Sequence, residues 1–460
     1  MSNRPRVKKQ LSRRSLRHFA EHFEGEIILP EDRRYSRARR VWNHAVNRHP
    51  ELIARCTCLG DVIRAVHLAR ESNLLAAVRA GGHSFAGHGV CDDGMVIDLS
   101  LMTQATIDPL SKLIRIAPGV LGGQLDHMTQ AFKLAVPLGS CPSTGVVGYA
   151  LGGGAGSLTS KFGYACDHIT QRELITVDGR KVIACEVERE DLFWAVRGAG
   201  ANFGIVTSLE LRLDPIEQVL SGHLKYPIRH ANKVLAFIKD YALGIPDDLF
   251  LLMAVLPHPG ERMLNISVVW PGDPRRGERV LTPLRKLIKP LEDNIQIRAY
   301  LDEQRAGSDN PGDGDYCTCR RAGHLEDLST ESIDVIVEYA ANAPTESSGI
   351  TMIFWHGQWC SQPRDNAFGF RRSGYHYWIH SYWQHTKQAA PAQKWVYDFF
   401  SALAPHSSGA VYVNDLQEEG EERIRAAYGD KYERLCQIKR KYDPSNFFCV
   451  NQNIRPALRA

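Results

Sequence analysis

At 460 residues, the chain is longer than one hydrophobic core usually supports, so we expect two domains. Hydrophobic residues make up 43% and charged residues 23% of the sequence, as in soluble globular proteins, and no apolar run is long enough to cross a bilayer. The formal net charge of +4 is small for this length and gives no reason to expect a nucleic-acid or anionic-membrane partner.

The first twenty residues are basic, and residues 12–16 read Ser-Arg-Arg-Ser-Leu, similar to a twin-arginine export signal. The following residues, 20–26, are charged rather than apolar, so we interpret this segment as a short solvated leader. The eleven cysteines cannot all pair, and the Cys-Thr-Cys triplets at 56–58 and 317–319 lack a second ligand pair at metal-binding spacing. We therefore expect free thiols, a cytoplasmic location and no bound metal.

Residues from about 50 to 215 alternate between helical and strand patterns that glycines interrupt. Residues 61–70 carry apolar positions at helical spacing, and Asp61 favours a helix start. We expect strands over 75–79, 95–99 and 113–116, the first of which leads into a glycine turn at 80–84. Glycines at the strand ends predict an α+β domain that binds a cofactor along its loops.

From about residue 216 to 415, glycine clusters are fewer and the strands are longer and more aromatic, as at 264–270 and 375–383. The composition of residues 308–314 predicts a loop. A final helix is expected over 421–442, because Pro444 prevents its continuation.

Neither common nucleotide fingerprint is present. The sequence has no Gly-x-x-x-x-Gly-Lys-Ser/Thr, and Thr159 and Phe203 stand where Gly-x-Gly-x-x-Gly requires its third glycine. Residues 78–84 read Val-Arg-Ala-Gly-Gly-His-Ser, in which two glycines after a strand let the backbone turn tightly and present several N–H groups to a pyrophosphate. The alternative is an ordinary Gly-Gly turn with a surface histidine, His83.

Segment 78–84 resembles the flavin loop of the vanillyl-alcohol-oxidase superfamily, and in particular that of the berberine-bridge-enzyme-like oxidases. Four further stretches match this family in the expected order, at residues 137–145, 151–167, 191–204 and 442–454. The resemblance covers nearly the whole chain after residue 15. It implies an α+β fold with a PCMH-type FAD-binding domain over 15–215. A substrate-binding domain would follow over 216–430, with an antiparallel sheet covered by helices. The C-terminal segment, 431–460, would return to the FAD domain.

The same resemblance implies an FAD held by two covalent bonds, an 8α-histidyl link at His83 and a 6-S-cysteinyl link at Cys166, which stands in a Gly-Tyr-Ala-Cys-Asp stretch. Imidazole and thiolate are both nucleophiles able to add to an oxidised flavin ring. The alternative for Cys166 is a buried structural thiol. The other FAD-binding residues implied by the matching motifs are Arg79, Ala80, Gly81, Gly82, Ser84, Gly139, Ser140, Ser143, Thr144, Gly145, Gly148, Gly152, Gly153, Gly154, Val206, Asn451 and Asn453.

A base for the substrate proton is expected near residue 415. Many bacterial relatives carry a tyrosine after a Tyr-Val-Asn segment, whereas residues 411–415 read Val-Tyr-Val-Asn-Asp and place Asp415 there. A carboxylate beside the flavin can act as a base with a pKa set by its pocket, or Asp415 can simply cap a turn. The missing tyrosine argues against a sugar oxidase.

The aromatic segment 375–383 resembles a substrate-domain strand of the family. His376 and His380 would lie about 13 Å apart on a strand, too far to share a metal ion. One face of this strand can line the substrate pocket, so Tyr375 and Tyr377 are candidate catalytic residues, with sheet packing as the alternative. His356 is a further candidate that can equally be a structural histidine.

The resemblance therefore implies an FAD-dependent oxidase that carries out a two-electron oxidation of an organic substrate, either a natural-product intermediate or a carbohydrate. Hydride would pass to flavin N5, and oxygen would reoxidise the flavin to give hydrogen peroxide. The alternatives are a flavin-dependent oxygenase or oxidative cyclase of secondary metabolism, and a non-catalytic flavin- or ligand-binding protein. The expected partners are a small-molecule substrate and molecular oxygen, with the chain as a monomer or homodimer.

Overall fold

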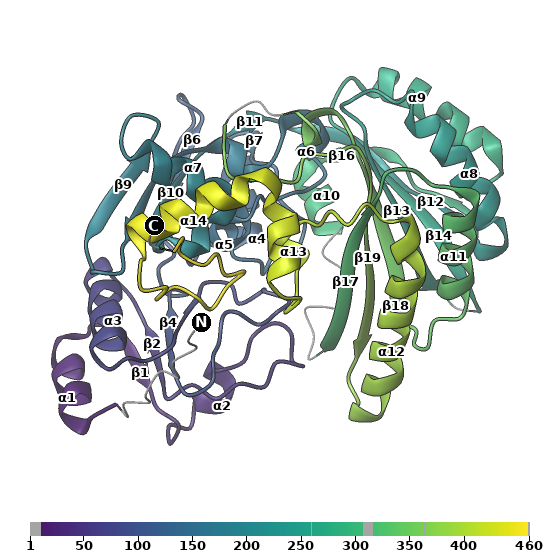
Figure 1. The fold of residues 1–460 in the computed structure, drawn as a ribbon. Coiled ribbons are helices and arrows are strands. Elements are labelled where there is room, and N and C mark those ends of the chain that lie inside the picture. The colour runs from purple at the N-terminus through teal and green to yellow at the C-terminus, as the bar shows by residue number, and fades with distance from the viewer. Residues whose placement is uncertain (1–10, 259, 307–315, 362–364, 459–460) are drawn as a thin grey trace.

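The computed structural model describes residues 11–258, 260–306, 316–361 and 365–458. The chain forms two lobes, one built from the N-terminal segments and the C-terminal helices, the other from a large sheet with helices on its outer side (Figure 1). The loop predicted over 308–314 lies outside the described residues. Within the described part, every helix is too short or too polar to cross a bilayer.

The first sheet has the strand order β1-β2-β4-β3, with β2 and β3 parallel to β4 and with β1 antiparallel to β2. Its elements are α1 (Arg13–His22), β1 (Glu26–Ile28), α2 (Tyr35–Ala38), β2 (Leu52–Arg55), α3 (Leu59–Glu71), β3 (Ala76–Arg79) and β4 (Met95–Asp98). The apolar side of α3 packs against these strands in one core. The helix predicted at 61–70 and the strands predicted at 75–79 and 95–99 are thus confirmed.

The second sheet is antiparallel, in the order β5-β6-β10-β8-β9. Its strands are β5 (Ala105–Asp108), β6 (Leu113–Ile116), β8 (Ile169–Ile175), β9 (Lys181–Cys185) and β10 (Ile205–Arg212), and β7 (Leu134–Ala135) pairs with β11 (Asp214–Pro215). The helices between them are α4 (Gly122–Gln130), α5 (Val146–Leu151), α6 (Thr159–Phe162) and α7 (Glu190–Ala199). The strand predicted at 113–116 is β6.

The third sheet forms the second lobe. Its order is β15-β12-β14-β13-β18-β19-β17, and β16 also pairs with β12. Its strands are β12 (Gln218–Pro227), β13 (Phe250–His258), β14 (Glu261–Trp270), β15 (Glu292–Asp293), β16 (Gln296–Ala299), β17 (Cys317–Leu325), β18 (Ser348–Trp355) and β19 (Gly374–Trp383). Its pairings are antiparallel, so the predicted antiparallel sheet and its strands at 264–270 and 375–383 are confirmed.

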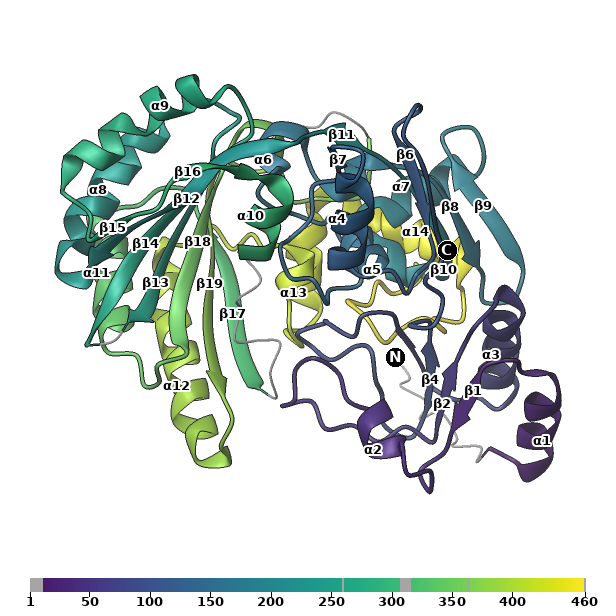
Figure 2. The ribbon, with the colours of Figure 1, turned by 180° about the vertical axis from the view of Figure 1, so that it is seen from behind.

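The outer face of this sheet is covered by helices (Figure 1). They are α8 (Ala231–Ala242), α9 (Pro274–Leu287), α11 (Thr330–Ala341) and α12 (Thr386–Leu403), and their apolar sides share one core with alternate residues of the strands. The inner face turns toward the first lobe, where α10 (Tyr300–Ala306) packs beside α4 (Figure 2). Gln304 Nε2 donates a hydrogen bond of 3.1 Å to Asp126 Oδ2 at this joint.

The predicted helix 421–442 is two helices, α13 (Glu421–Tyr428) and α14 (Tyr432–Tyr442). The break falls at Gly429, whose φ of 57° lies in the left-handed region that a helix cannot use. This break lets α14 turn back onto α7 of the first lobe.

A buried ion pair fixes the returning C-terminal segment. Lys439 Nζ lies 2.7 Å from Asp443 Oδ2, both side chains are 0% exposed, and Lys439 also donates to Asn202 O and Phe448 O. Asp443 accepts the backbone N–H groups of Phe447 and Phe448. The pair thereby joins α14, the tail and the segment after α7.

Replacing Lys439 is expected to be costly, because Asp443 would remain buried without its cation. Lys439→Met should lower the free energy of unfolding in urea by about 3 kcal/mol. Lys441→Met on the same helix is the matched control: Lys441 is 62% exposed in its pair with Asp191, and its loss should cost less than about 1 kcal/mol. Equal losses of unfolding free energy in the two variants would contradict the role of the Lys439–Asp443 pair in fixing the C-terminal segment.

Candidate active site

A cavity of about 960 Å³ lies between the two lobes. Its walls come from the loops at 79–85, 138–149, 198–206 and 450–452 and from the inner face of the third sheet. Segments far apart in the sequence therefore meet around one space, as expected for a ligand site at a domain interface.

Two of the loops touch through their glycines. A Cβ atom on Gly81 would lie 2.3 Å from Gly145 N, and one on Gly145 would lie 2.7 Å from Gly81 N. Gly82 has a φ of +71°, which a side chain would strain. Only glycine permits this close approach of the strand-end turn to the loop that precedes α5.

Most of the predicted FAD-binding residues line this cavity, namely Arg79, Ala80, Gly81, Gly82, His83, Ser84, Gly139, Ser140, Thr144, Gly145, Gly148, Gly152, Val206 and Asn451. Ser143 lines an adjoining cavity that shares the 79–83 loop. The four other predicted residues, Gly153, Gly154, Cys166 and Asn453, line neither cavity.

His83 is held in place on the cavity wall. Its ring stacks on Trp42 with centroids 5.3 Å apart, and its Nδ1 lies 3.5 Å from Thr144 Oγ1. Trp42 is in turn packed edge-on against Phe85 and Tyr382. The imidazole is therefore half-buried and oriented, as an attachment point requires.

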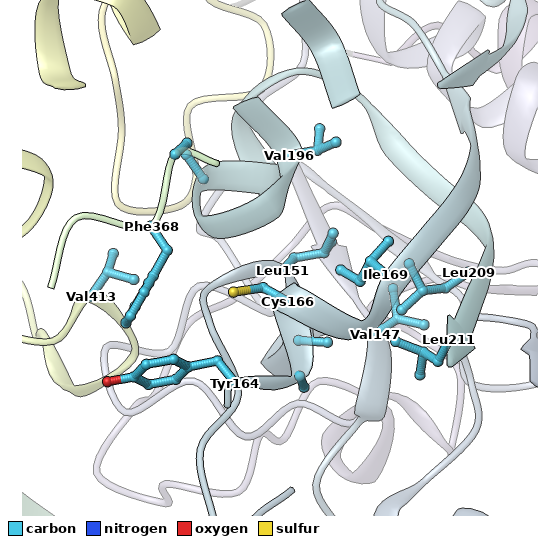
Figure 3. Close-up of a cluster of buried hydrophobic side chains, with 14 of the residues drawn as sticks. Val147, Leu151, Tyr164, Cys166, Ile169, Val196, Leu209, Leu211, Phe368 and Val413 are labelled. Atoms are coloured by element: carbon cyan, nitrogen blue, oxygen red, sulfur yellow. The ribbon is translucent and has the colours of Figure 1, made fainter. Parts of the chain in front are cut away.

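Cys166, the second predicted attachment point, does not reach the cavity. Cys166 is 0% exposed, in a turn between α6 and β8, and its side chain packs among apolar residues that include Leu151, Ile169 and Phe368 (Figure 3). Burial raises the pKa of its thiol, and the charge of Asp167 adds to the effect. The alternative interpretation, a buried structural thiol, is the one that fits.

The motif around Cys166 serves a different purpose. The carboxylate of Asp167 accepts hydrogen bonds from Arg371 and from Asn366 Nδ2, at 2.5 to 3.1 Å, and all three side chains are buried. Asp167 therefore ties the turn before β8 to the segment before β19. This structural role accounts for the aspartate of the cysteine-aspartate pair.

Sequence reasoning missed Cys141. Of the eleven cysteines, all within the described residues and none in a disulfide, Cys141 is the one that lines the cavity. Its side chain is partly exposed, and its Sγ lies 3.5 Å from Ser143 Oγ. The signal was available, because Cys141 stands inside the matching Gly-Ser-Cys-Pro-Ser-Thr-Gly stretch at 139–145.

Asp415 lies at the centre of a buried charged group on the cavity wall. Arg320 of β17 donates a hydrogen bond of 2.6 Å to Asp415 Oδ1, and His376 of β19 lies 2.7 Å from Oδ2 through its Nε2. Arg320 is sandwiched between the rings of Phe85 and Trp378, at 4.3 and 4.6 Å. The carboxylate is thus oriented from both sides, which a simple turn cap would not need.

The surroundings keep Asp415 ionised. Burial opposes its charge, but the guanidinium of Arg320 and the hydrogen bond to His376 outweigh burial and hold the pKa of the carboxyl below its usual value. Because an ionised carboxylate only accepts hydrogen bonds, His376 carries its proton on Nε2. Burial lowers the pKa of the neighbouring His380 to about 3, an effect that Arg320 increases, so His380 is neutral near pH 7.

Two of the predicted catalytic residues, Tyr375 and Tyr377, lie outside the cavity. On β19, His376, Trp378 and His380 line it, so the alternate residues Tyr375 and Tyr377 point to the helices of the outer face. Tyr375 packs on Phe354, and Tyr377 shares a hydrogen bond of 2.8 Å with Ser407. The residues of β19 therefore alternate between the two faces, and the face with Tyr375 and Tyr377 is the one that packs against the helices.

His356 is a structural histidine. Its Nε2 lies 2.7 Å from Leu249 O, its ring stacks on Phe354, and it does not line the cavity. The structure therefore gives the predicted catalytic role of His356 no support.

The cavity suits FAD in the chemistry of its donors and acceptors. Buried polar atoms of several lining residues, among them Trp42 Nε1, His376 Nδ1 and Asn451 Oδ1, have no hydrogen-bond partner among the described residues, as expected where a polar ligand completes a site. A Cβ on Gly148 would meet no atom within 4 Å, so its backbone is open to a ligand.

Two family models match the sequence. One, described as an FAD binding domain, covers residues 50–185, and the other, described as berberine and berberine like, covers residues 411–455. The first includes His83 and Cys141, and the second includes Asp415. The matched segments thus contain the residues that meet in the cavity.

The chain also matches characterised oxidases over almost its full length. It is 30% identical to (R)-6-hydroxynicotine oxidase of Paenarthrobacter nicotinovorans, over 94% of this chain and 97% of that protein. It is 27% identical to xylooligosaccharide oxidase of Thermothelomyces thermophilus, over 89% and 88%. The crystal structure of 6-hydroxy-D-nicotine oxidase from Arthrobacter nicotinovorans superposes with a TM-score of 0.89 at 28% identity, over 95% and 98%.

The lowered pKa of Asp415 predicts a pH-dependent contribution to stability. Asp415→Asn should lower the free energy of unfolding by about 3 kcal/mol at neutral pH, because Arg320 is left without its counter-charge. A carboxyl with a lowered folded-state pKa stabilises above its unfolded value of about 3.9 and loses this effect as pH falls. The difference between wild type and variant, measured by urea unfolding, should therefore shrink below about pH 4. A pH-independent difference would contradict the ionised state.

Proposed function

The chain belongs to the berberine-like family of FAD-linked oxidases, and on that premise we propose that Asp415 takes up the proton of a small organic substrate that is oxidised in the cavity. The protein is an FAD-dependent oxidase that carries out a two-electron oxidation. The observation that carries the proposal is the position of Asp415, held between Arg320 and His376 on the wall of the cavity that His83 also lines.

We propose that His83 and Cys141 hold the FAD covalently. The oriented imidazole of His83 and the accessible thiol of Cys141 support this assignment, since both line the cavity and both are nucleophiles able to add to an oxidised flavin. Buried Cys166 has no such access. The glycine turn at 81–82 and the loops at 139–148 and 198–206 would hold the rest of the cofactor.

This assignment divides the chain into a cofactor-binding part and a substrate-binding part. We propose that residues 15–215 and 431–460 bind FAD and that residues 216–430 bind substrate. The buried pair Lys439–Asp443 and the contact of α14 with α7 support the return of the tail to the first part. The inner face of the third sheet supplies the substrate side.

When bound, FAD would supply the acceptor for a hydride, with oxygen as the final electron acceptor and hydrogen peroxide as the product. The substrate proton is accepted by a side chain of the protein. As hydride leaves an alcohol carbon, the hydroxyl becomes strongly acidic, so even a carboxylate of low pKa such as Asp415 can accept its proton. His376 and Arg320 act as positioning residues that fix the two carboxylate oxygens and preserve the charge.

The covalent links are tested with single and double substitutions. His83→Ala and Cys141→Ser should each keep the yellow colour in the acid-precipitated protein, because one link remains, and the double variant should release it. Cys166→Ser is the control and should behave as wild type. Colour retained by the double variant, or a lower flavin content in Cys166→Ser alone, would refute the assignment.

The proposed base is tested by anaerobic flavin reduction with a substrate selected from a panel of alcohols and amines. Asp415→Asn should slow reduction by about 10²- to 10⁴-fold, the usual loss of a general base. His376→Gln should slow it less and should also change its pH dependence, because it disturbs Asp415 only through a hydrogen bond. Photochemical reduction of the flavin should remain unaffected in both variants.

The matched control is Tyr375→Phe, a neighbour of His376 on the opposite face of β19. It should leave the rate constant of flavin reduction within about twofold, since surface or packing changes away from the reacting atoms remove no transition-state contact. A large loss in Tyr375→Phe combined with a small one in Asp415→Asn would reverse the proposed roles.

A further inference from the structure

The inner face of the third sheet carries an apolar wall, which consists of Leu252, Ala254 and Leu256 of β13, Val269 of β14 and Ile353 of β18. All five line the cavity, and Leu252, Leu256 and Ile353 are only partly buried although they face the interior. Apolar side chains that remain accessible inside a cavity offer a contact surface for an apolar ligand.

Strand register places this wall beside the proposed base. Leu252 is paired with Ile353 across β13 and β18, and Ile353 is paired with His376 across β18 and β19. Side chains of directly opposed residues on one face lie about 5 Å apart at their Cβ atoms. A substrate with its reacting carbon at Asp415 can therefore lay its body across Ile353 and Leu252.

The buried part of the cavity offers no uncompensated charge to that body. The charged lining side chains Arg79, Arg320, Asp415 and Glu303 each lie within ion-pair distance of an opposite charge. Glu346, the other carboxylate among the lining residues, is exposed to solvent. His380 is neutral, and two aromatic rings cover Arg320. A charged substrate would thus lose its hydration without gaining a counter-ion.

We propose that the substrate is an uncharged alcohol with an apolar ring body, and not a carbohydrate. This proposal rests on the proposed oxidase function. A sugar laid on this wall would bury several hydroxyl groups against Leu252, Ile353 and Val269. Ser267 and Thr351, which pair with Leu252 and Ala254 and also line the cavity, could satisfy only part of them. A ring alcohol has one hydroxyl to satisfy, and Asp415 accepts its hydrogen bond.

The reaction balances with Asp415 as the proton acceptor and oxygen as the final electron acceptor. The carbinol C–H bond breaks and its electron pair leaves as hydride, the O–H proton goes to Asp415, and a C=O bond forms. The net change is one alcohol and one molecule of oxygen to one carbonyl compound and one hydrogen peroxide.

The test compares ligand classes on the flavin-loaded protein. Under anaerobic conditions, 1-phenylethanol and cyclohexanol should bleach the flavin at least about tenfold faster, at equal concentration, than glucose or cellobiose, the discrimination expected from a few misplaced contacts. Acetophenone, which cannot be oxidised here, should bind and perturb the flavin absorbance, whereas gluconolactone should not. Faster bleaching by a sugar, or tighter binding of the lactone, would overturn the proposal.

Variants of the wall add a readout independent of turnover. Leu252→Asn and Ile353→Asn should each weaken acetophenone binding about tenfold, because they replace apolar contact with an unpaired amide. Leu243→Asn is the matched control, since Leu243 is 83% exposed outside the cavity, and it should bind as wild type does. Unchanged binding in both wall variants, with normal flavin content, would also overturn the proposal.

The outcomes separate this inference from the oxidase assignment. Acetophenone binding that depends on Leu252 but occurs without bleaching by any alcohol or amine would support the wall and refute the proposed chemistry. Rapid bleaching by a sugar alone would support the oxidase and refute the apolar substrate.

Discussion

A buried negative charge organises the centre of this molecule. Asp415 can stay ionised away from solvent only because Arg320 and His376 each supply a hydrogen bond to one of its oxygens. The three residues come from β17, β19 and the segment that leaves the sheet for the first lobe. Satisfying this one carboxylate therefore fixes the sheet edge and the return of the chain relative to each other.

The other side of the cavity depends on backbone rather than charge. Gly81 and Gly145 approach so closely that neither position has room for a Cβ, and this contact brings the turn after β3 against the loop before α5. His83 and Cys141 belong to these two segments, and both reach the cavity. Close packing of the loops thus determines which nucleophiles can meet a ligand.

Cys166 stands in a recognised motif, but its surroundings are those of a core residue. Its neighbour Asp167 is bound by Arg371 and Asn366 in a buried network, so the turn is a structural joint and the thiol lies in the core. The two cysteines stand in motifs of similar glycine content. What separates them is burial, a property that depends on segments some two hundred residues away.

The sequence by itself determined the elements of the first lobe, the antiparallel sheet with its long aromatic strands, and the glycine turn that ends in His83, because hydrophobic period, turn chemistry and glycine placement are local. It also identified Asp415 as a candidate base from its position alone. The face of β19 that meets the cavity, the break of the last helix at Gly429, the access of Cys141 to the cavity and the burial of Cys166 were decided by the tertiary structure. Alternation along a strand is a local property, but which face is covered by helices depends on contacts between distant segments.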